Sequence, residues 1–251
     1  MSQRFAIAIL IATSLLASAP ASAADLKVLG AGPVERPFNT LVPGFTRDTG
    51  HKAEGVFDTV GVILSMLKKG DKADIIILSP VGMDELEKAG ALVAGTRIEV
   101  GRAANGLGVR AGAPAPDIST PDAVKKALLA AKTIGYVDPA VGASNGIFFA
   151  SVIKKLGITD EVNKKATLFK RGHQVASALA DGKVEIGNTS LTELAADKGV
   201  RVVGPLPKGI DLFTPYVAAV ATASPNADAA RALIAYLMRP ASREQFKADG
   251  L

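Results

Sequence analysis

Small polar residues cluster where predicted strands give way to predicted helices, and these turns are the parts of the sequence best suited to chemistry. They are rich in Gly, Ser, Thr and Asn, which offer hydroxyl or amide groups and let a backbone approach a ligand closely. Each turn is also explained by helix capping alone. Because helix N-termini beyond the carboxyl ends of strands present unpaired N–H donors, the turns together favour a small anion held by dipoles. The candidate ligand-binding residues are Ala31, Gly32, Thr59, Val60, Gly61, Ser79, Ser144, Asn145, Arg171, Asn188 and Thr189.

Short β-rich runs alternate with helical patterns, which is typical of an α/β protein with mainly parallel sheets flanked by helices. Pro43 lies inside the first helical pattern and predicts a kink or a break there. Asp58 and Ser144 are expected to cap the helices that follow them. We expect strands at 26–29, 53–57, 74–78, 106–110, 133–137, 167–170, 185–188 and 216–221, and helices at 34–45, 59–69, 83–89, 121–131, 145–156, 174–180, 227–238 and 242–248.

The order of these elements favours two sheets in two lobes. The last strand and helices have no strand partner nearby in the sequence, so we expect them to return to the first lobe. The chain would then cross between lobes near 102–105 and near 208–215, which would act as a hinge. This predicts a first lobe of residues 24–102 plus 214–251 and a second lobe of residues 103–213.

The first 23 residues predict export. Arg4 precedes an almost uninterrupted apolar run from Phe5 to Ala17, and Ala21-Ser22-Ala23 supplies the small residues of a cleavage site. The run is shorter than the ~20 residues of a membrane span, which disfavours the alternative of an uncleaved anchor. We therefore expect a periplasmic protein that begins near Ala24.

The composition excludes several classes of site. The chain has no cysteine, so it has no disulfide framework, no thiolate nucleophile and no thiolate metal ligand. Its two histidines, His51 and His173, give no ligand cluster, and we predict neither metal nor other cofactor. With 5% aromatic residues and no tryptophan, the chain offers little for stacking nucleic-acid bases, so nucleic acid is not an expected partner.

Two short motifs suggest other chemistry but lack its context. Gly142-Ala143-Ser144-Asn145-Gly146 matches the G-x-S-x-G of a hydrolase, yet 138–141 separates it from the preceding strand, whereas a nucleophile elbow follows its strand directly. Gly30-Ala31-Gly32 could open a dinucleotide-binding fingerprint, but Glu35 stands where the third glycine belongs. Ser144 is better explained as a capping residue and hydrogen-bond donor at the start of a helix.

Segments distributed over the whole mature chain are similar to those of one transport family. They are Lys27–Gly32, Phe45–His51, Ala73–Leu78, Asp138–Ser144, Leu179–Gly187 and Ala230–Leu251. In this order they resemble periplasmic solute-binding proteins of ABC transporters, specifically the molybdate-binding type. The resemblance implies the two-lobed type II periplasmic-binding-protein fold, which closes on one small ligand and delivers it to a membrane permease.

The resemblance also implies how an oxyanion would be held, and the side chains here differ. Molybdate binders use two serine hydroxyls from the first two turns, backbone amides and a tyrosine late in the second lobe. The first serine corresponds here to Ala31 or Gly32, the second to Asp58 or Thr59, and the tyrosine to 188–190. An arginine near a turn or the hinge would suit a carboxylate, and the candidates are Arg36, Arg102 and Arg171.

Two functions remain open at this point. The first is a monomeric binding component of an ABC transporter for a small anion, an organic carboxylate in preference to molybdate, with the inner-membrane permease as its partner. The alternative is a periplasmic isomerase of a small tricarboxylate, similar to the aconitate isomerases that resemble this family. Such an enzyme needs a base near a carbon acid, for which Glu35, Asp58 or His173 are candidates.

Overall fold

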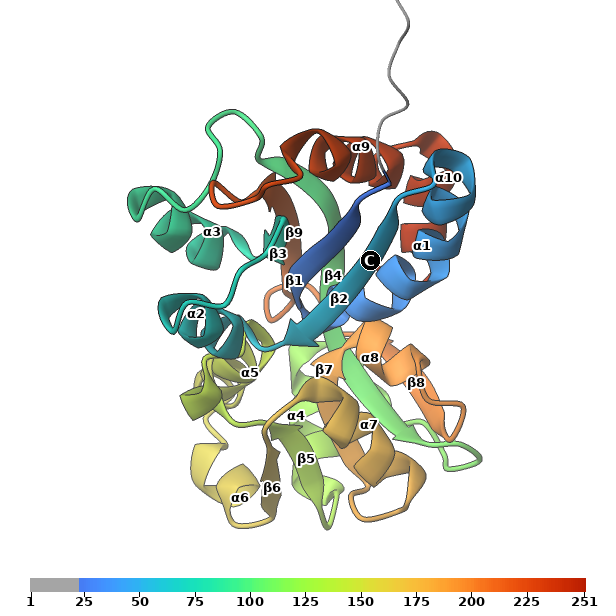
Figure 1. Cartoon of the computed structure of the whole chain (residues 1–251). Helices are drawn as coiled ribbons and strands as arrows, with labels where there is room; N and C mark the ends of the chain where they lie inside the picture. Colours follow the sequence, from blue (N-terminus) through green and yellow to red (C-terminus); the bar gives the residue numbers. More distant parts are fainter. Residues whose placement is uncertain (1–22) are drawn as a thin grey trace, which may run out of the picture.

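The computed structural model describes residues 23–251 and shows two lobes, one above the other in Figure 1, that meet at a narrow waist. The export signal predicted for residues 1–23 falls outside the described residues, apart from Ala23. Among the described residues, the helices are all too short or too polar to cross a membrane.

The first lobe is built from the two ends of the described chain. Its elements are β1 (Asp25–Ala31), the 3-10 turn η1 (Gly32–Val34), α1 (Glu35–Thr49), β2 (Lys52–Asp58), α2 (Val60–Lys68), β3 (Ile75–Leu78), α3 (Pro80–Lys88), β9 (Phe213–Val220), α9 (Ala227–Leu237) and α10 (Pro240–Ala248). Helices α2 and α3 cover one face of its sheet, and α1, α9 and α10 cover the other (Figure 1).

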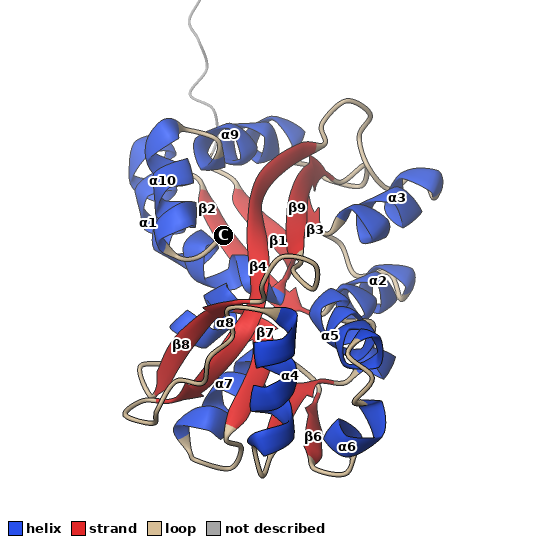
Figure 2. Cartoon of the chain, turned by 180° about the vertical axis from the view of Figure 1, so that it is seen from behind, coloured by secondary structure: helices blue, strands red, loops and turns tan. Residues whose placement is uncertain are grey.

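The second lobe is built from the middle of the chain. Its elements are α4 (Pro121–Ala130), β5 (Ile134–Val137), the 3-10 turn η2 (Pro139–Val141), α5 (Ser144–Lys155), α6 (Thr159–Asn163), β6 (Ala166–Phe169), α7 (Gly172–Ala180), β7 (Ile186–Ser190), α8 (Leu191–Ala195) and β8 (Val200–Pro205). From behind, α4 lies in front of this sheet and α7 behind it (Figure 2).

One long strand, β4 (Ile98–Arg110), belongs to both lobes. Its first half pairs antiparallel with β9, and its second half pairs antiparallel with β7 and β8. The strand order is β2-β1-β3-β9-β4-β7-β5-β6, with β8 added beside β4. The outer pairs are parallel, as predicted, but the strands at the waist are antiparallel. The lobes are therefore joined by paired strands.

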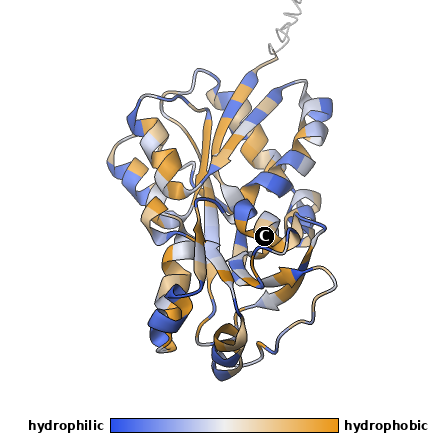
Figure 3. Cartoon of the chain, turned by 90° about the horizontal axis from the view of Figure 1, so that it is seen from below, coloured by the Kyte–Doolittle hydropathy of each residue, from blue (hydrophilic) through white to orange (hydrophobic). Residues whose placement is uncertain are grey.

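Each lobe has its own apolar core. In the first lobe, the four residues of β3 are buried on both faces, as their continuous apolar run predicts. In the second lobe, Phe149 and Leu107 are fully buried. The helices carry polar residues on their outer sides (Figure 3), so burial of one apolar face against the sheet holds them in place. Ala103, in the middle of β4, packs in the first of these cores.

The structure corrects several local predictions. Helix α1 continues through Pro43, so the predicted break is wrong. Thr59, and not Asp58, is the N-cap of α2, because its hydroxyl accepts the hydrogen bond from the N–H of Val62 at 3.3 Å. Ala143 occupies the N-cap of α5, which leaves Ser144 as the first helical residue. In both cases the N-cap lies one residue away from the predicted position.

Candidate functional site

A small cleft lies between the lobes, at the turns that the sequence singled out. Seven of the predicted residues line it: Ala31, Gly32, Thr59, Val60, Ser144, Asn145 and Arg171. The cleft is also lined by Pro33, Glu35, Phe57, Asp58, Ala143, Gly172, His173, Glu193 and Tyr216. It encloses about 30 Å³, which leaves room for little more than water. The lobes are thus closed against each other in this structure.

The remaining predicted residues lie outside the cleft lining. Gly61 faces the carbonyl oxygen of Val141, which a Cβ atom would approach to 2.7 Å, so this glycine lets the lobes touch. Ser79 is buried at the start of α3, and its hydroxyl makes no capping bond. Asn188 is buried at the waist, where its amide donates to the side-chain oxygen of Asn105 at 2.7 Å.

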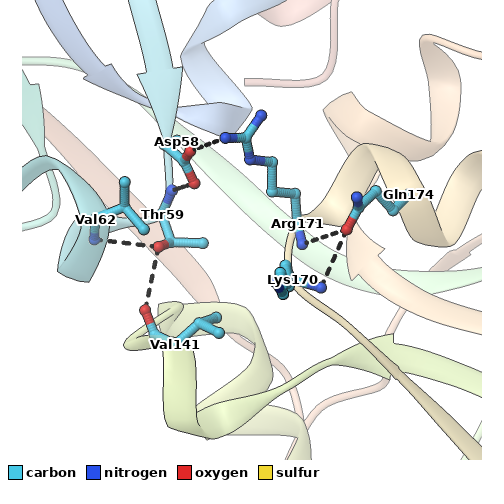
Figure 4. A network of polar contacts seen from close by, with 7 residues as sticks. All are labelled: Asp58, Thr59, Val62, Val141, Lys170, Arg171 and Gln174. Carbon is cyan, nitrogen blue, oxygen red and sulfur yellow. Dashed lines mark hydrogen bonds and ion pairs between the residues drawn. The ribbon is translucent and has the colours of Figure 1, made fainter.

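An ion pair closes one side of the cleft. Arg171 is the N-cap residue of α7 in the second lobe, and its guanidinium contacts the buried carboxylate of Asp58 at the end of β2 (Figure 4). Gln174 fixes the turn, because its side-chain oxygen accepts hydrogen bonds from the N–H groups of Lys170 and Arg171, both at 3.1 Å. The Arg171 side chain is 49% exposed, so it keeps access to solvent and to the cleft.

Thr59 connects the lobes a second time. Its hydroxyl donates to the carbonyl oxygen of Val141 at 3.1 Å while it accepts from the N–H of Val62 within α2 (Figure 4). The hydroxyl therefore closes the cleft and caps a helix at once. A ligand that needed this oxygen would have to replace the Val141 contact.

The carboxyl group of Glu193 is the feature that sequence reasoning missed. Glu193 lies on the short helix α8 and is partly buried, between the turns that hold Gly32 and Gly172. Its Oε2 accepts hydrogen bonds from the hydroxyls of Thr189 at 2.6 Å and Ser190 at 2.7 Å. Burial raises the pKa of the Glu193 carboxyl, although these hydroxyls and nearby His173 act in the opposite direction. Thr189, a predicted ligand contact, thus lies behind Glu193.

Tyr216 enters the cleft from β9, close to the waist. Its side chain is buried, and burial together with the charge of Glu193 raises the pKa of its phenol. The sequence comparison with molybdate binders placed the tyrosine position at 188–190, where there is none. Tyr216 nevertheless supplies a tyrosine to the cleft. The feature of the sequence that could have indicated it is its place as the first residue of the predicted strand after the second crossing between lobes.

The three predicted arginines lie in different surroundings, and one of them lines the cleft. Arg102 pairs with Glu99 on the surface of β4, with its Nε 2.6 Å from the carboxylate. Arg36 lies outside the cleft and spans the lobes, since it donates to the carbonyl oxygen of Ala195 and pairs with the buried carboxylate of Asp249 at 3.1 Å. Only Arg171, of the predicted set, lines the cleft.

The described residues form neither the nucleophile elbow of a serine hydrolase nor a cluster of metal ligands. The turn η2 separates β5 from Ser144, so the sharp strand-to-helix elbow of a serine hydrolase is not formed. Across residues 23–251, His, Asp and Glu side chains form no group of three or more that could hold a metal ion. The cleft contains acidic as well as neutral groups, which differs from the purely dipolar lining that the turns suggested.

Comparisons with known proteins agree with this geometry. Residues 26–251 match the family described as bacterial extracellular solute-binding protein. An aconitate isomerase from a Pseudomonas species is 30% identical over 249 residues, which covers 97% of this chain and 92% of the relative. The molybdate-binding protein ModA of Azotobacter vinelandii is 29% identical over 256 residues, which covers 97% of this chain and 96% of the relative.

Solved structures show the same fold. The periplasmic molybdate-binding protein of Azotobacter vinelandii superposes with a TM-score of 0.77 at 18% identity and covers 90% of this chain and 97% of its own. The sulfate-binding protein SubI of Mycobacterium tuberculosis gives 0.72 at 17% identity, with 90% and 86% covered. The predicted two-lobed fold is confirmed, and the chain belongs to the family of bacterial extracellular solute-binding proteins.

Proposed function

We propose that this protein binds a small organic anion with more than one carboxylate in the cleft between its lobes. The observation that carries the proposal is the position of Arg171, which lines the cleft at the start of α7 with its side chain half exposed. A guanidinium has a planar set of N–H donors that matches a carboxylate, so it can hold a guest carboxylate bidentately. Asp58 then serves as the counterion that orients the arginine.

The lining suits a carboxylate better than a tetrahedral oxyanion. The hydroxyl of Thr59 already accepts a hydrogen bond from the N–H of Val62 and donates one to the carbonyl oxygen of Val141. Ala31 and Gly32 provide no hydroxyl. The cleft instead brings together Arg171, Asn145 and Ser144, whose side chains can all donate hydrogen bonds to a carboxylate.

Binding requires the lobes to separate first. The enclosed volume of about 30 Å³ is too small for a polycarboxylate, so the contacts Arg171–Asp58 and Thr59–Val141 must open and re-form around the guest. A ligand that contacts both lobes shifts this equilibrium towards the closed form. The family implies an ABC-transporter permease as the partner, and we propose that a monomeric periplasmic form of this chain delivers the anion to it.

A second candidate function is isomerisation of a small tricarboxylate on the same scaffold. It is favoured by the similarity to an aconitate isomerase over nearly the whole chain, together with a carboxyl group, Glu193, that lines the cleft and has a raised pKa. Proton transfer to or from carbon needs such a group.

The test is a melting screen followed by calorimetry. We expect cis-aconitate, trans-aconitate or shorter dicarboxylates to raise the melting temperature more than molybdate, tungstate or sulfate. Arg171→Lys keeps the charge but loses the planar fork, and should weaken binding by about tenfold or more. Arg102→Lys is the matched control, since Arg102 pairs with Glu99 away from the cleft. Tighter binding of molybdate than of every carboxylate, or unchanged binding in Arg171→Lys, would refute the proposal.

A further inference from the structure

The two oxygens of the Glu193 carboxyl have different surroundings. Oε2 accepts hydrogen bonds from the hydroxyls of Thr189 and Ser190, and Asn145 Nδ2 lies 3.4 Å from the same oxygen. Within residues 23–251, Oε1 accepts no hydrogen bond, and it faces the first lobe, where a Cβ atom on Gly32 would lie 2.9 Å from it. One oxygen is thus anchored and the other is presented to the cleft.

The anchoring groups are themselves ordered in a chain. Asn145 Nδ2 donates to the hydroxyl of Thr189 at 2.7 Å, and that hydroxyl donates to Glu193. The hydroxyl of Thr192 lies 3.0 Å from that of Ser190, which also donates to Glu193. Because each hydroxyl is fixed by a second group, the carboxyl has one preferred orientation, and its free oxygen points to one place.

We propose that Glu193 is a catalytic residue that moves a proton between two carbons of an unsaturated polycarboxylate bound in the cleft. This inference rests on the proposed function, because it needs a carboxylate held by Arg171. It assigns the chemistry to a residue on the short helix α8, which nothing in the sequence marked as functional.

The step balances without a cofactor. Ionised Glu193 takes a proton from a methylene carbon through Oε1, and the C–H electron pair passes through the neighbouring double bond into a carboxylate of the guest. The double bond moves by one carbon, and the proton of Glu193 is then given to the carbon that had been vinylic. Arg171 stabilises the charge that develops on the guest carboxylate, and Glu193 ends as it began.

The other acid and base groups around the cleft are less suited to this step. Asp58 is committed to the guanidinium of Arg171 and to the N–H of Thr59 at 2.7 Å. Glu35 and His173 line the cleft, but both residues are exposed to solvent, where a base is not shielded from water. Burial raises the pKa of Glu193, which makes its carboxylate a stronger base than an ordinary glutamate.

The experiment compares binding and turnover in the same protein preparations. Binding of cis- and trans-aconitate is measured by calorimetry, and their interconversion is followed by proton NMR. We expect turnover by the parent protein, and Glu193→Gln should bind within about threefold of the parent while turnover falls by about 100-fold or more. Glu54→Gln is the matched control, because Glu54 is an exposed carboxylate on β2 that is not among the lining residues. Melting temperatures confirm that each variant is folded.

A positioning variant separates catalysis from structure. Thr189→Val removes a hydrogen bond that lowers the pKa of Glu193, so the acid limb of the rate profile should move to higher pH. Binding of both probes without interconversion by the parent, or full turnover by Glu193→Gln, would overturn the inference and leave the proposed function standing. Failure of the parent to bind either probe would refute the proposed function for tricarboxylates and this inference with it.

Discussion

Replacement of Gly172 by alanine should destabilise the protein, because the new methyl group would overlap the carboxyl group of Glu193. A Cβ atom on Gly172 would meet both carboxyl oxygens inside their contact distance. The carboxyl is the flexible end of a side chain, but the hydroxyls of Thr189 and Ser190 hold it at 2.6 and 2.7 Å. Losing one hydrogen bond to a charged group costs about 1.5–3 kcal/mol, and overpacking costs about 1–3 kcal/mol. We therefore expect Gly172→Ala to lower the free energy of unfolding by about 2 kcal/mol.

The same substitution should have the opposite sign once the glutamate is gone. In a Glu193→Ala background the methyl group no longer meets a carboxyl, and alanine is favoured over glycine in a helix by up to about 1 kcal/mol. Gly172→Ala should then stabilise α7 slightly, because Gly172 is its first residue and has no left-handed backbone conformation to preserve. The coupling energy between the two positions should be about 2–3 kcal/mol.

Urea denaturation of the parent, both single variants and the double variant gives this coupling directly. Circular dichroism reports the unfolding of the helices, and an unchanged dependence on urea concentration shows that the compactness of the states is unaffected. In thermal melts, about 1 kcal/mol corresponds to roughly 2–4 °C for a chain of this size. An equal cost of Gly172→Ala in both backgrounds would show that Glu193 does not pack against α7, and the description of the cleft would be wrong.

Further predictions address the cleft and the first core. Thr59→Val should weaken ligand binding by about 1–2 kcal/mol, measured by calorimetry, because it removes the helix cap and the bond to Val141; unchanged affinity would contradict the role given to this hydroxyl. Because the pKa of Glu193 is raised in the folded state, its ionisation costs stability as pH rises through that pKa. Glu193→Gln should therefore gain stability relative to the parent as the pH rises above about 4, by about 1.4 kcal/mol for each unit by which the folded-state pKa is raised, whereas a pH-independent difference in urea unfolding would argue against it. Asp74→Ala should cost about 3 kcal/mol in urea unfolding, since the buried Asp74 carboxylate accepts hydrogen bonds from the N–H of Lys27 and the hydroxyl of Ser224; a loss below about 1 kcal/mol would be inconsistent with these contacts.

The turns around the cleft were predictable because their position follows from the alternation of strands and helices. Thr59, Ser144 and Arg171 all follow strands whose apolar runs are clear in the sequence, and the carboxyl ends of these strands meet at one place. Which residue caps each helix was less predictable. It depends on a shift of one position, and Asp58 and Ser144 are both good capping residues by type.

Glu193 and Tyr216 could not be found in the same way. Glu193 lies on a helix of five residues, which is too short to show a helical period, directly after a polar run that was interpreted as a turn. The first part of β4, residues 98–105, was also missed, because Glu99, Gly101 and Arg102 interrupt its apolar pattern. Gly106 is required there, since a Cβ atom would collide with the backbone of Gly204 on β8.

Because β4 is shared between the two sheets, it limits how this protein could be divided into fragments. One end of the strand is bonded to β9 and the other to β7 and β8, so a cut at the waist would leave unpaired backbone groups on both fragments. Neither fragment would be a self-sufficient folding unit, and heating should give a single calorimetric transition. Swapping one lobe between relatives would therefore have to exchange matched halves of this strand, and not merely the loops around it.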